Sequence, residues 1–173
     1  MNFEQYIPLA VSTESVKPFQ GLHGHRVSRL MHASLGIITE LNELEEHTNS
    51  TNFIEEIGDV MWYLAVICNT FSIIPRPIPS NRDLANSAAA CLCDISKRAY
   101  FYGIGVPGEK LPQILTYVES IMGHLERISG NRLEQAMAAN IAKLKRRYPD
   151  KFSEQRAVNR DLRVEQSALE SEL

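Results

Sequence analysis

Apolar residues recur at steps of three and four along most of the chain. In the segment VSRLMHASLGIITELNELEEH, which begins at Val27, this spacing joins Leu30, Ala33, Ile37, Leu41 and Leu44. Such a period is typical of an amphipathic helix with one apolar face. The polar run TNSTN follows and interrupts the pattern. The segment therefore predicts a long helix that ends before a polar turn.

Further helices are predicted on both sides of this segment. Asn52 followed by Glu55 resembles a capping box and predicts a helix over residues 53–71. Other expected helices span residues 3–12, 83–102, 113–128 and 133–148, with the proline-containing SIIPRPIPSNR as a loop. Because alternation typical of strands is not evident, we predict an all-α antiparallel helical bundle of about five main helices.

Length and composition favour one globular domain over residues 1–173, with an N-terminal arm (about 1–26) and a charged C-terminal tail (about 153–173). Hydrophobic residues make up 44% and charged residues 23% of the chain, as in ordinary globular proteins. We expect the tail to be partly helical and to lie on a partner subunit.

Charge and apolar runs exclude several classes of function. The net charge of -3 argues against nucleic-acid binding, which needs a basic surface. Apolar runs are too short to cross a bilayer, and the N-terminus lacks the pattern of a signal peptide. The three cysteines are not spaced as metal ligands usually are, so we interpret them as reduced thiols. We expect a cytoplasmic protein that binds neither a membrane nor nucleic acid.

Two pairs of carboxylates point to metal chemistry. Glu40 and Glu43 are three positions apart, and so are Glu56 and Asp59, so the members of each pair lie on one helical face. The residues between the pairs suffice for a turn and an antiparallel helix, which would bring all four together. Four like charges need cations to neutralise them, and oxygen ligands select Mg²⁺ or Mn²⁺.

Simple solvation is the alternative interpretation of these acidic residues. A chain with 21 acidic residues can place carboxylates three apart by chance. We assign Glu45, Glu46 and Glu55 to this class because they lie near the turn between the two helices, where solvation and helix-end electrostatics explain them.

A basic face lies near the end of the predicted helix 133–148. Asn140, Lys143 and Arg147 share one helical face, whereas Lys145 and Arg146 point elsewhere. Two cations and an amide suit phosphate oxygens, although cations near a helix C-terminus also arise for solubility and dipole reasons. Together with the acidic site, this face favours a metal-chelated polyphosphate as ligand.

Aromatic residues and one histidine lie near the acidic pairs. Tyr63 follows Asp59 by four positions and is expected to contact a base or sugar. Trp62 points about 100° away and is interpreted as a core residue. His32 is left out of the site because the sequence places no other histidine at metal-ligand spacing from it.

Three blocks of sequence resemble the MazG-like all-α nucleoside triphosphate pyrophosphohydrolases. LGIITELNEL is similar to the family's ExxE helix, EEIGDVMWYL to its ExxD helix, and NIAKLKRRYPDKF with NRDL to its C-terminal segment. The resemblance implies that the four carboxylates bind Mg²⁺ and are catalytic, and that Asn140, Lys143, Arg147 and Tyr148 contact the substrate. Thr39 and Asn42 depart from the glycines of many relatives.

The resemblance implies a homodimeric or homotetrameric enzyme that cleaves a nucleoside triphosphate substrate to the monophosphate and pyrophosphate. Three alternatives stay open. A phosphoribosyl-ATP pyrophosphatase or a dUTPase would use the same metal site, and a non-catalytic nucleotide-binding bundle would act as a regulator. A ferritin-like di-iron bundle expects Glu-x-x-His pairs, and neither His47 nor His124 lies at that spacing from the candidate ligands.

Overall fold

A computed structural model describes residues 1–14, 24–104, 106, 108–149, 152–159 and 161–171. Every regular element in these ranges is a helix, which confirms the predicted all-α class. The α-helices are α1 (Phe3–Val11), α2 (Gly24–Glu45), α3 (Ser50–Phe71), α4 (Arg82–Tyr102), α5 (Leu111–Ser129), α6 (Leu133–Arg147), α7 (Glu154–Val158) and α8 (Leu162–Glu170). Short 3₁₀ turns over Gly108–Lys110 and Gly130–Arg132 precede α5 and α6.

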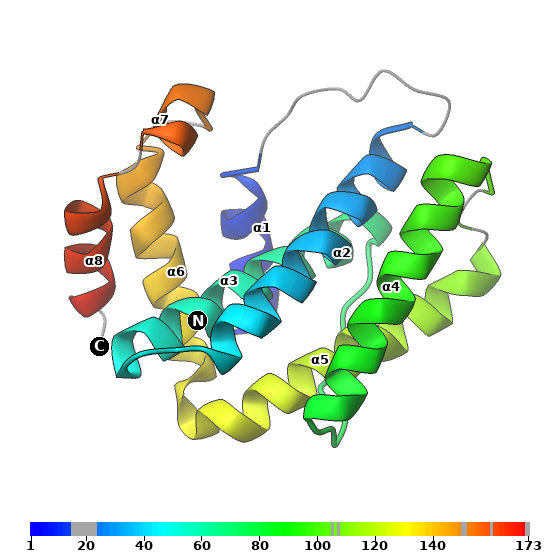
Figure 1. The fold of residues 1–173 in the computed structure, drawn as a ribbon, viewed down its shortest axis with the longest axis horizontal. Coiled ribbons are helices and arrows are strands. Elements are labelled where there is room, and N and C mark those ends of the chain that lie inside the picture. The colour runs from blue at the N-terminus through cyan, green and yellow to red at the C-terminus, as the bar shows by residue number, and fades with distance from the viewer. Residues whose placement is uncertain (15–23, 105, 107, 150–151, 160, 172–173) are drawn as a thin grey trace.

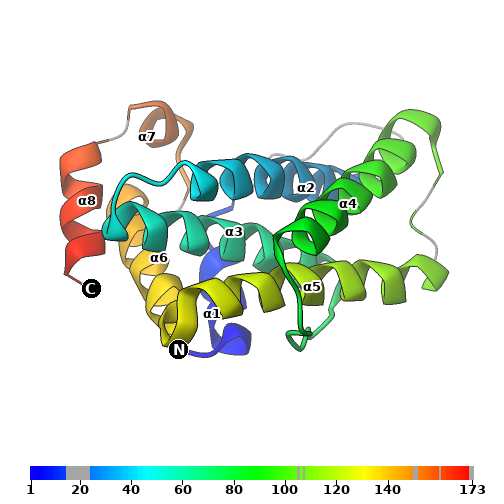
Figure 2. The same ribbon diagram turned by 60° about the horizontal axis from the view of Figure 1, so that its bottom comes forward.

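The long helices α2 and α3 form an antiparallel pair in the middle of the bundle. The helices α4 and α5 pack at one end of this pair, and α6 and α8 pack at the other (Figure 1). Figure 2 shows α1 beside α3 and α6. The five long helices expected from the apolar spacing are α2 to α6, and no described helix is long and apolar enough to span a membrane.

The turn between α2 and α3 shows that the predicted capping box of the second long helix was wrong. Asn49, not Asn52, is the N-cap of α3, and its side chain accepts a hydrogen bond from the backbone N–H of Asn52. The helix therefore begins three residues earlier than expected, because the run Asn49, Ser50, Thr51 offers several residues that can cap a helix. The side chain of Asn52 is left to donate to Glu56, at 2.5 Å.

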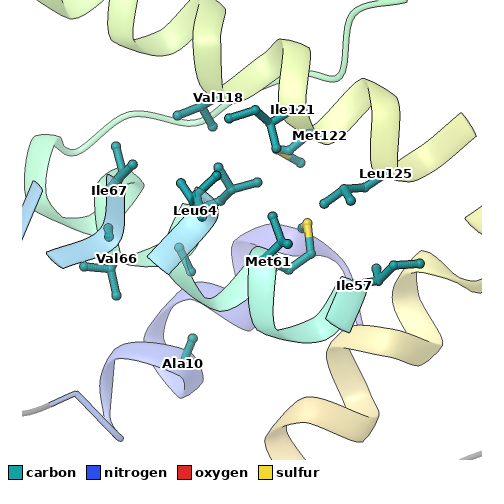
Figure 3. Packing of buried hydrophobic residues seen from close by; sticks show 14 of the residues in the cluster. Ala10, Ile57, Met61, Leu64, Val66, Ile67, Val118, Ile121, Met122 and Leu125 are labelled. Carbon is teal, nitrogen blue, oxygen red and sulfur yellow. The ribbon is translucent and has the colours of Figure 1, made fainter. Parts of the chain in front are cut away.

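The core is centred on α3, which is buried on most of its circumference. Met61, Leu64 and Ile67 are fully buried and face a row of apolar residues on α5 (Figure 3). Burial of each such side chain stabilises the fold by about 1.5–3 kcal/mol. This packing fixes α3, so the polar residues on its remaining edge have defined positions.

The first and last described helices, α1 and α8, both pack on the bundle. Tyr6 and Ala10 bury one side of α1 against α3 and α6, and Ala168 and Leu169 bury one side of α8 against α6. The tail was expected to be partly helical and to lie on a partner subunit. It is helical in α7 and α8, but α8 lies on α6 of its own chain. The apolar pair Ala168 and Leu169 explains this, since it gives the otherwise charged tail a face to bury.

The proline-containing segment between α3 and α4 is the expected loop, and it lies along α5. The backbone N–H of Ile78 donates to the carbonyl of Glu119 at 3.3 Å. Gly123 permits this approach, because a Cβ atom added there would lie 1.8 Å from the carbonyl oxygen of Ile78. The loop is therefore held against the bundle by backbone contacts.

Candidate functional site

Three of the four predicted metal ligands converge between α2 and α3. Glu40 and Glu43 come from the last two turns of α2, and Glu56 comes from the second turn of α3. One carboxylate oxygen from each lies within 4.8 Å of the others. The antiparallel pairing of the two helices produces this arrangement, because it sets the ExxE face of α2 opposite the start of α3.

The fourth predicted ligand, Asp59, lies on the same wall but is turned toward α6. Its Oδ1 accepts from the Asn140 side-chain amide at 2.6 Å, and both of its carboxylate oxygens accept from the Lys143 ammonium, at 2.7 and 2.6 Å. Asp59 is therefore neutralised by α6, whereas the three glutamates face one another. The site divides into a three-carboxylate cluster and a charge-paired aspartate beside it.

The carboxylates of the cluster repel one another, and two of them have raised pKa values. Burial, with the negative charge of Asp59 and the neighbouring carboxylates adding to it, raises the pKa of Glu40 to about 8. Burial and the charge of Asp59 likewise raise the pKa of Glu56 to about 7, with Lys143 acting in the opposite direction. Carboxylates held close together in a partly buried place favour protons, and a divalent cation would relieve the same repulsion.

These carboxylates line a cavity of about 600 Å³, a size that accommodates a small organic ligand. Its walls are unequal in character, with acidic residues at one side and aromatic, apolar and basic residues around the rest. The lining residues are Thr13, His32, Glu40, Glu43, Glu55, Glu56, Asp59, Trp62, Tyr63, Leu144, Arg147, Tyr148, Phe152 and Leu162. Such a cavity can hold a ligand with one charged end and one flat, less polar end.

The aromatic wall is built by α2 and α3. The rings of Trp62 and Tyr63 lie edge to face with centroids 4.9 Å apart, and His32 contacts Tyr63 in the same way at 5.5 Å. Gly36 makes room for Tyr63, because a Cβ atom there would lie 2.2 Å from the Tyr63 Cζ atom. Burial, together with the charge of Glu40, raises the pKa of Tyr63 to about 12, so its hydroxyl stays protonated and can donate.

The basic face predicted on α6 has two parts, one bound to acidic residues of α3 and one at the cavity. Lys143 is 1% exposed and bound to Asp59 and, at 3.0 Å, to Glu55. Asn140 is also 1% exposed and is bound to Asp59. Neither side chain lines the cavity, so their predicted contact with substrate stays a prediction. Lys145 and Arg146 are exposed, as expected.

Arg147 and Tyr148, in contrast, do line the cavity. The Arg147 guanidinium donates to both carboxylate oxygens of Glu165 on α8, at 2.8 and 2.6 Å, and its Cζ atom lies over the Tyr148 ring, 5.8 Å from the centroid. Tyr148 packs against Phe152 with ring centroids 5.2 Å apart. Arg147 is thus the predicted cation that the structure places at the cavity.

Several lining residues were assigned elsewhere by the sequence or were not predicted. Glu55 was assigned to solvation, yet it lines the cavity and accepts from Lys143. Trp62, interpreted as core, packs on the core and also borders the cavity, with its indole N–H donating to the Ala10 carbonyl and to Thr13. His32 was left out of the site although it lies on the wall. The four-residue step from His32 to Gly36 to Glu40 was the available signal, since it puts all three on one face of α2.

Phe152 and Leu162 were also missed, because they follow the last long helix, in a stretch that carries no amphipathic period long enough to assign a face. Both line the cavity, and Leu162 does so as the first residue of α8. Position in the fold, rather than any local motif, makes them part of the site.

The donor set fits a hard divalent cation. Glu40, Glu43 and Glu56 offer oxygen atoms only, and no histidine or cysteine of the described chain joins their cluster. Oxygen ligands favour Mg²⁺ or Mn²⁺, whereas iron in ferritin-like bundles is held partly by imidazole. The repulsion that raises the pKa of two of these glutamates is one that a bound cation would offset.

Comparisons of the chain with models of protein families, with known proteins and with solved structures found no match. The resemblance to the MazG-like enzymes therefore stays a prediction from three blocks of sequence. What the described residues establish is an all-α bundle with a three-carboxylate cluster at the wall of a cavity.

Proposed function

We propose that the protein is a Mg²⁺-dependent nucleoside triphosphate pyrophosphohydrolase with an antiparallel bundle of the MazG-like type. One observation carries the proposal: carboxylates from two facing helices meet at one wall of a cavity whose other walls hold Arg147 and a group of aromatic rings. A triphosphate chelated to a divalent cation has the charges to match the acidic wall and Arg147. A nucleobase has the flat face to match the rings.

The position of each residue in the cavity indicates its proposed role. Glu40, Glu43 and Glu56 would hold the cation, with Asp59 beside them. Bound there, Mg²⁺ or Mn²⁺ would supply the Lewis acid that lowers the pKa of water and offsets charge on a leaving pyrophosphate. Arg147 would neutralise phosphate oxygens of the substrate.

The aromatic wall would hold the rest of the nucleotide. Tyr63 would contact the base or sugar, as predicted, and Trp62, His32 and Tyr148 extend the surface on which a ring can lie. The protonated hydroxyl of Tyr63 is available as a donor. These residues contact the substrate without taking part in bond breaking.

The proposed reaction is hydrolysis at the α-phosphorus. A water oxygen forms a bond to that phosphorus while the bond from phosphorus to the bridging oxygen of the β-phosphate breaks. The water proton passes to a carboxylate or to solvent, and the products are the nucleoside monophosphate and pyrophosphate. We also propose a homodimer or homotetramer, which light scattering of the purified chain would test.

The test of the activity is a panel of ribo- and deoxyribonucleoside triphosphates with Mg²⁺ or with a chelator, and chromatographic identification of products. We expect pyrophosphate and a monophosphate with Mg²⁺ only, and loss of product in Glu56→Gln. Glu46→Gln is the matched control, because Glu46 is exposed and lies outside the cavity. Binding of nucleotide without turnover would favour the regulator instead, and selective cleavage of dUTP or phosphoribosyl-ATP would name the narrower enzyme.

A further inference from the structure

A chain of hydrogen bonds leads from the N-terminal helix to the acidic site. Tyr6 of α1 is fully buried, and its hydroxyl lies 2.7 Å from Oδ1 of Asn140 and 3.2 Å from the carbonyl oxygen of Gly58. Asn140 in turn donates from Nδ2 to Oδ1 of Asp59 at 2.6 Å. The phenol of Tyr6 is thus two hydrogen bonds from a carboxylate of the site.

The hydroxyl of Tyr6 and the carboxylate of Asp59 together determine which way the Asn140 amide points. Burial, with the charge of Asp59 adding to it, raises the pKa of Tyr6 well above its usual value, so the phenol keeps its single proton. It donates this proton to the nearer acceptor, the Asn140 oxygen. The amide nitrogen then faces Asp59 and donates to it. With the amide reversed, the Asn140 and Asp59 side-chain oxygen atoms would stand at hydrogen-bond distance without a proton between them.

Close approach of α3 and α6 makes the chain of bonds possible. A Cβ atom at Gly58 would lie 2.9 Å from the Ala136 carbonyl oxygen and 2.9 Å from the Asn140 Cβ atom. The missing side chain at Gly58 therefore lets Asn140 lie directly against the turn of α3 that carries Asp59. Of the three glutamates, which face the cavity, Glu56 is held by the Asn52 amide of its own helix.

We propose that Tyr6 is a positioning residue that acts through Asn140 to fix the orientation of Asp59 at the metal site. Tyr6 does not line the cavity, and its hydroxyl touches neither substrate nor cation. The inference rests on the proposed function, because it assumes that the acidic site binds a divalent cation. Residues that orient metal-site carboxylates from outside typically change metal affinity by about 10- to 100-fold when they are removed.

Binding of Mn²⁺ alone tests the proposal, with free Mn²⁺ measured by electron paramagnetic resonance. We expect Tyr6→Phe, which keeps the ring and its packing, to raise the Mn²⁺ dissociation constant about tenfold. Tyr117→Phe is the matched control, because Tyr117 lies on α5 outside the cavity, and it should bind Mn²⁺ as the wild type does. Circular dichroism establishes that each variant is folded.

A double-mutant cycle with Asn140→Ala separates positioning from a general loss of stability. If Tyr6 acts through Asn140, Tyr6→Phe should change Mn²⁺ affinity little once Asn140 is already replaced. Equal affinity of Tyr6→Phe and wild type, even with a lower melting temperature, would overturn the inference alone, and so would additive effects in the cycle. A wild-type protein without Mn²⁺ affinity would overturn the proposed function and the inference with it.

Discussion

Replacement of Lys143 by methionine is a direct test of how the fold tolerates its acidic site. Lys143 is 1% exposed and is the shared cation of Asp59 and Glu55. Burial disfavours the ammonium, but the two carboxylates outweigh this effect, and the pKa of Lys143 lies above its usual value. Lys143→Met keeps an unbranched side chain of similar length and removes the charge, which leaves two partly buried carboxylates without their partner.

The expected loss of stability follows from the exposure of those carboxylates. Removal of one partner from a buried ion pair costs about 3–5 kcal/mol. The Asp59 and Glu55 side chains keep 25% and 22% of their surface, so water screens part of the unpaired charge. We therefore expect about 2–3 kcal/mol, or a fall in Tm of about 4–12 °C for a chain of this size.

Urea unfolding with a chelator at neutral pH measures this loss. Lys145→Met is the matched control, since Lys145 lies on the same helix and is exposed, and it should change the free energy of unfolding by less than about 0.5 kcal/mol. A Lys143→Met protein as stable as this control would refute the assignment of Lys143 as the counter-ion of Asp59 and Glu55.

Three further predictions follow from the structure. The free energy of unfolding should fall as pH rises from about 4.5 to about 8 in chelator, because folded Glu40 and Glu56 keep protons that the unfolded chain has released. Glu40→Gln should flatten this dependence, and a urea midpoint that rises with pH across this window would contradict it. Gly123→Ala should cost about 1–3 kcal/mol by urea unfolding, because the added Cβ meets the Ile78 carbonyl. Gly108→Ala, at which a Cβ meets nothing within 4 Å, is its control, and equal urea midpoints would count against the packed loop. Glu165→Gln should weaken the hold on Arg147 and lower the KM for a triphosphate with kcat little changed, and a raised KM in steady-state assays would argue that Glu165 positions Arg147 instead.

The helices were predictable because their apolar spacing is long and regular. Leu30, Ile37 and Leu41 are all buried, as their period required. The start of α3 was not predicted correctly, since Asn49 and Asn52 are chemically equivalent caps and only the turn geometry selects between them. The docking of α8 was missed because its buried face has only two apolar residues, Ala168 and Leu169, beside the carboxylate Glu165.

The candidate site was predictable to the level of helical faces. The two pairs of acidic residues three positions apart placed Glu40, Glu43 and Glu56 together, as the structure has them. The sequence did not predict which side chains pair across helices. The same basic face that suggested phosphate contacts instead places Lys143 against Asp59, because α6 packs on α3 at Gly58.

The remaining features of the site depend on contacts between segments that are distant in the sequence. Tyr6 and Asn140 are 134 positions apart, and Arg147 and Glu165 belong to different helices. No local period or motif relates such residues, so a single sequence gives no reason to pair them. The aromatic wall depended on Gly36, whose lack of a side chain has meaning only once Tyr63 lies against it.

Anomalous diffraction from crystals grown with Mn²⁺ would test the central claim, that carboxylates of two facing helices form a divalent-cation site. We expect an anomalous peak within bonding distance of oxygen atoms of Glu40, Glu43 and Glu56, and its loss in Glu56→Gln. Crystals of the wild-type protein that contain Mn²⁺ only at other places, or that show the three glutamates apart from one another, would contradict it.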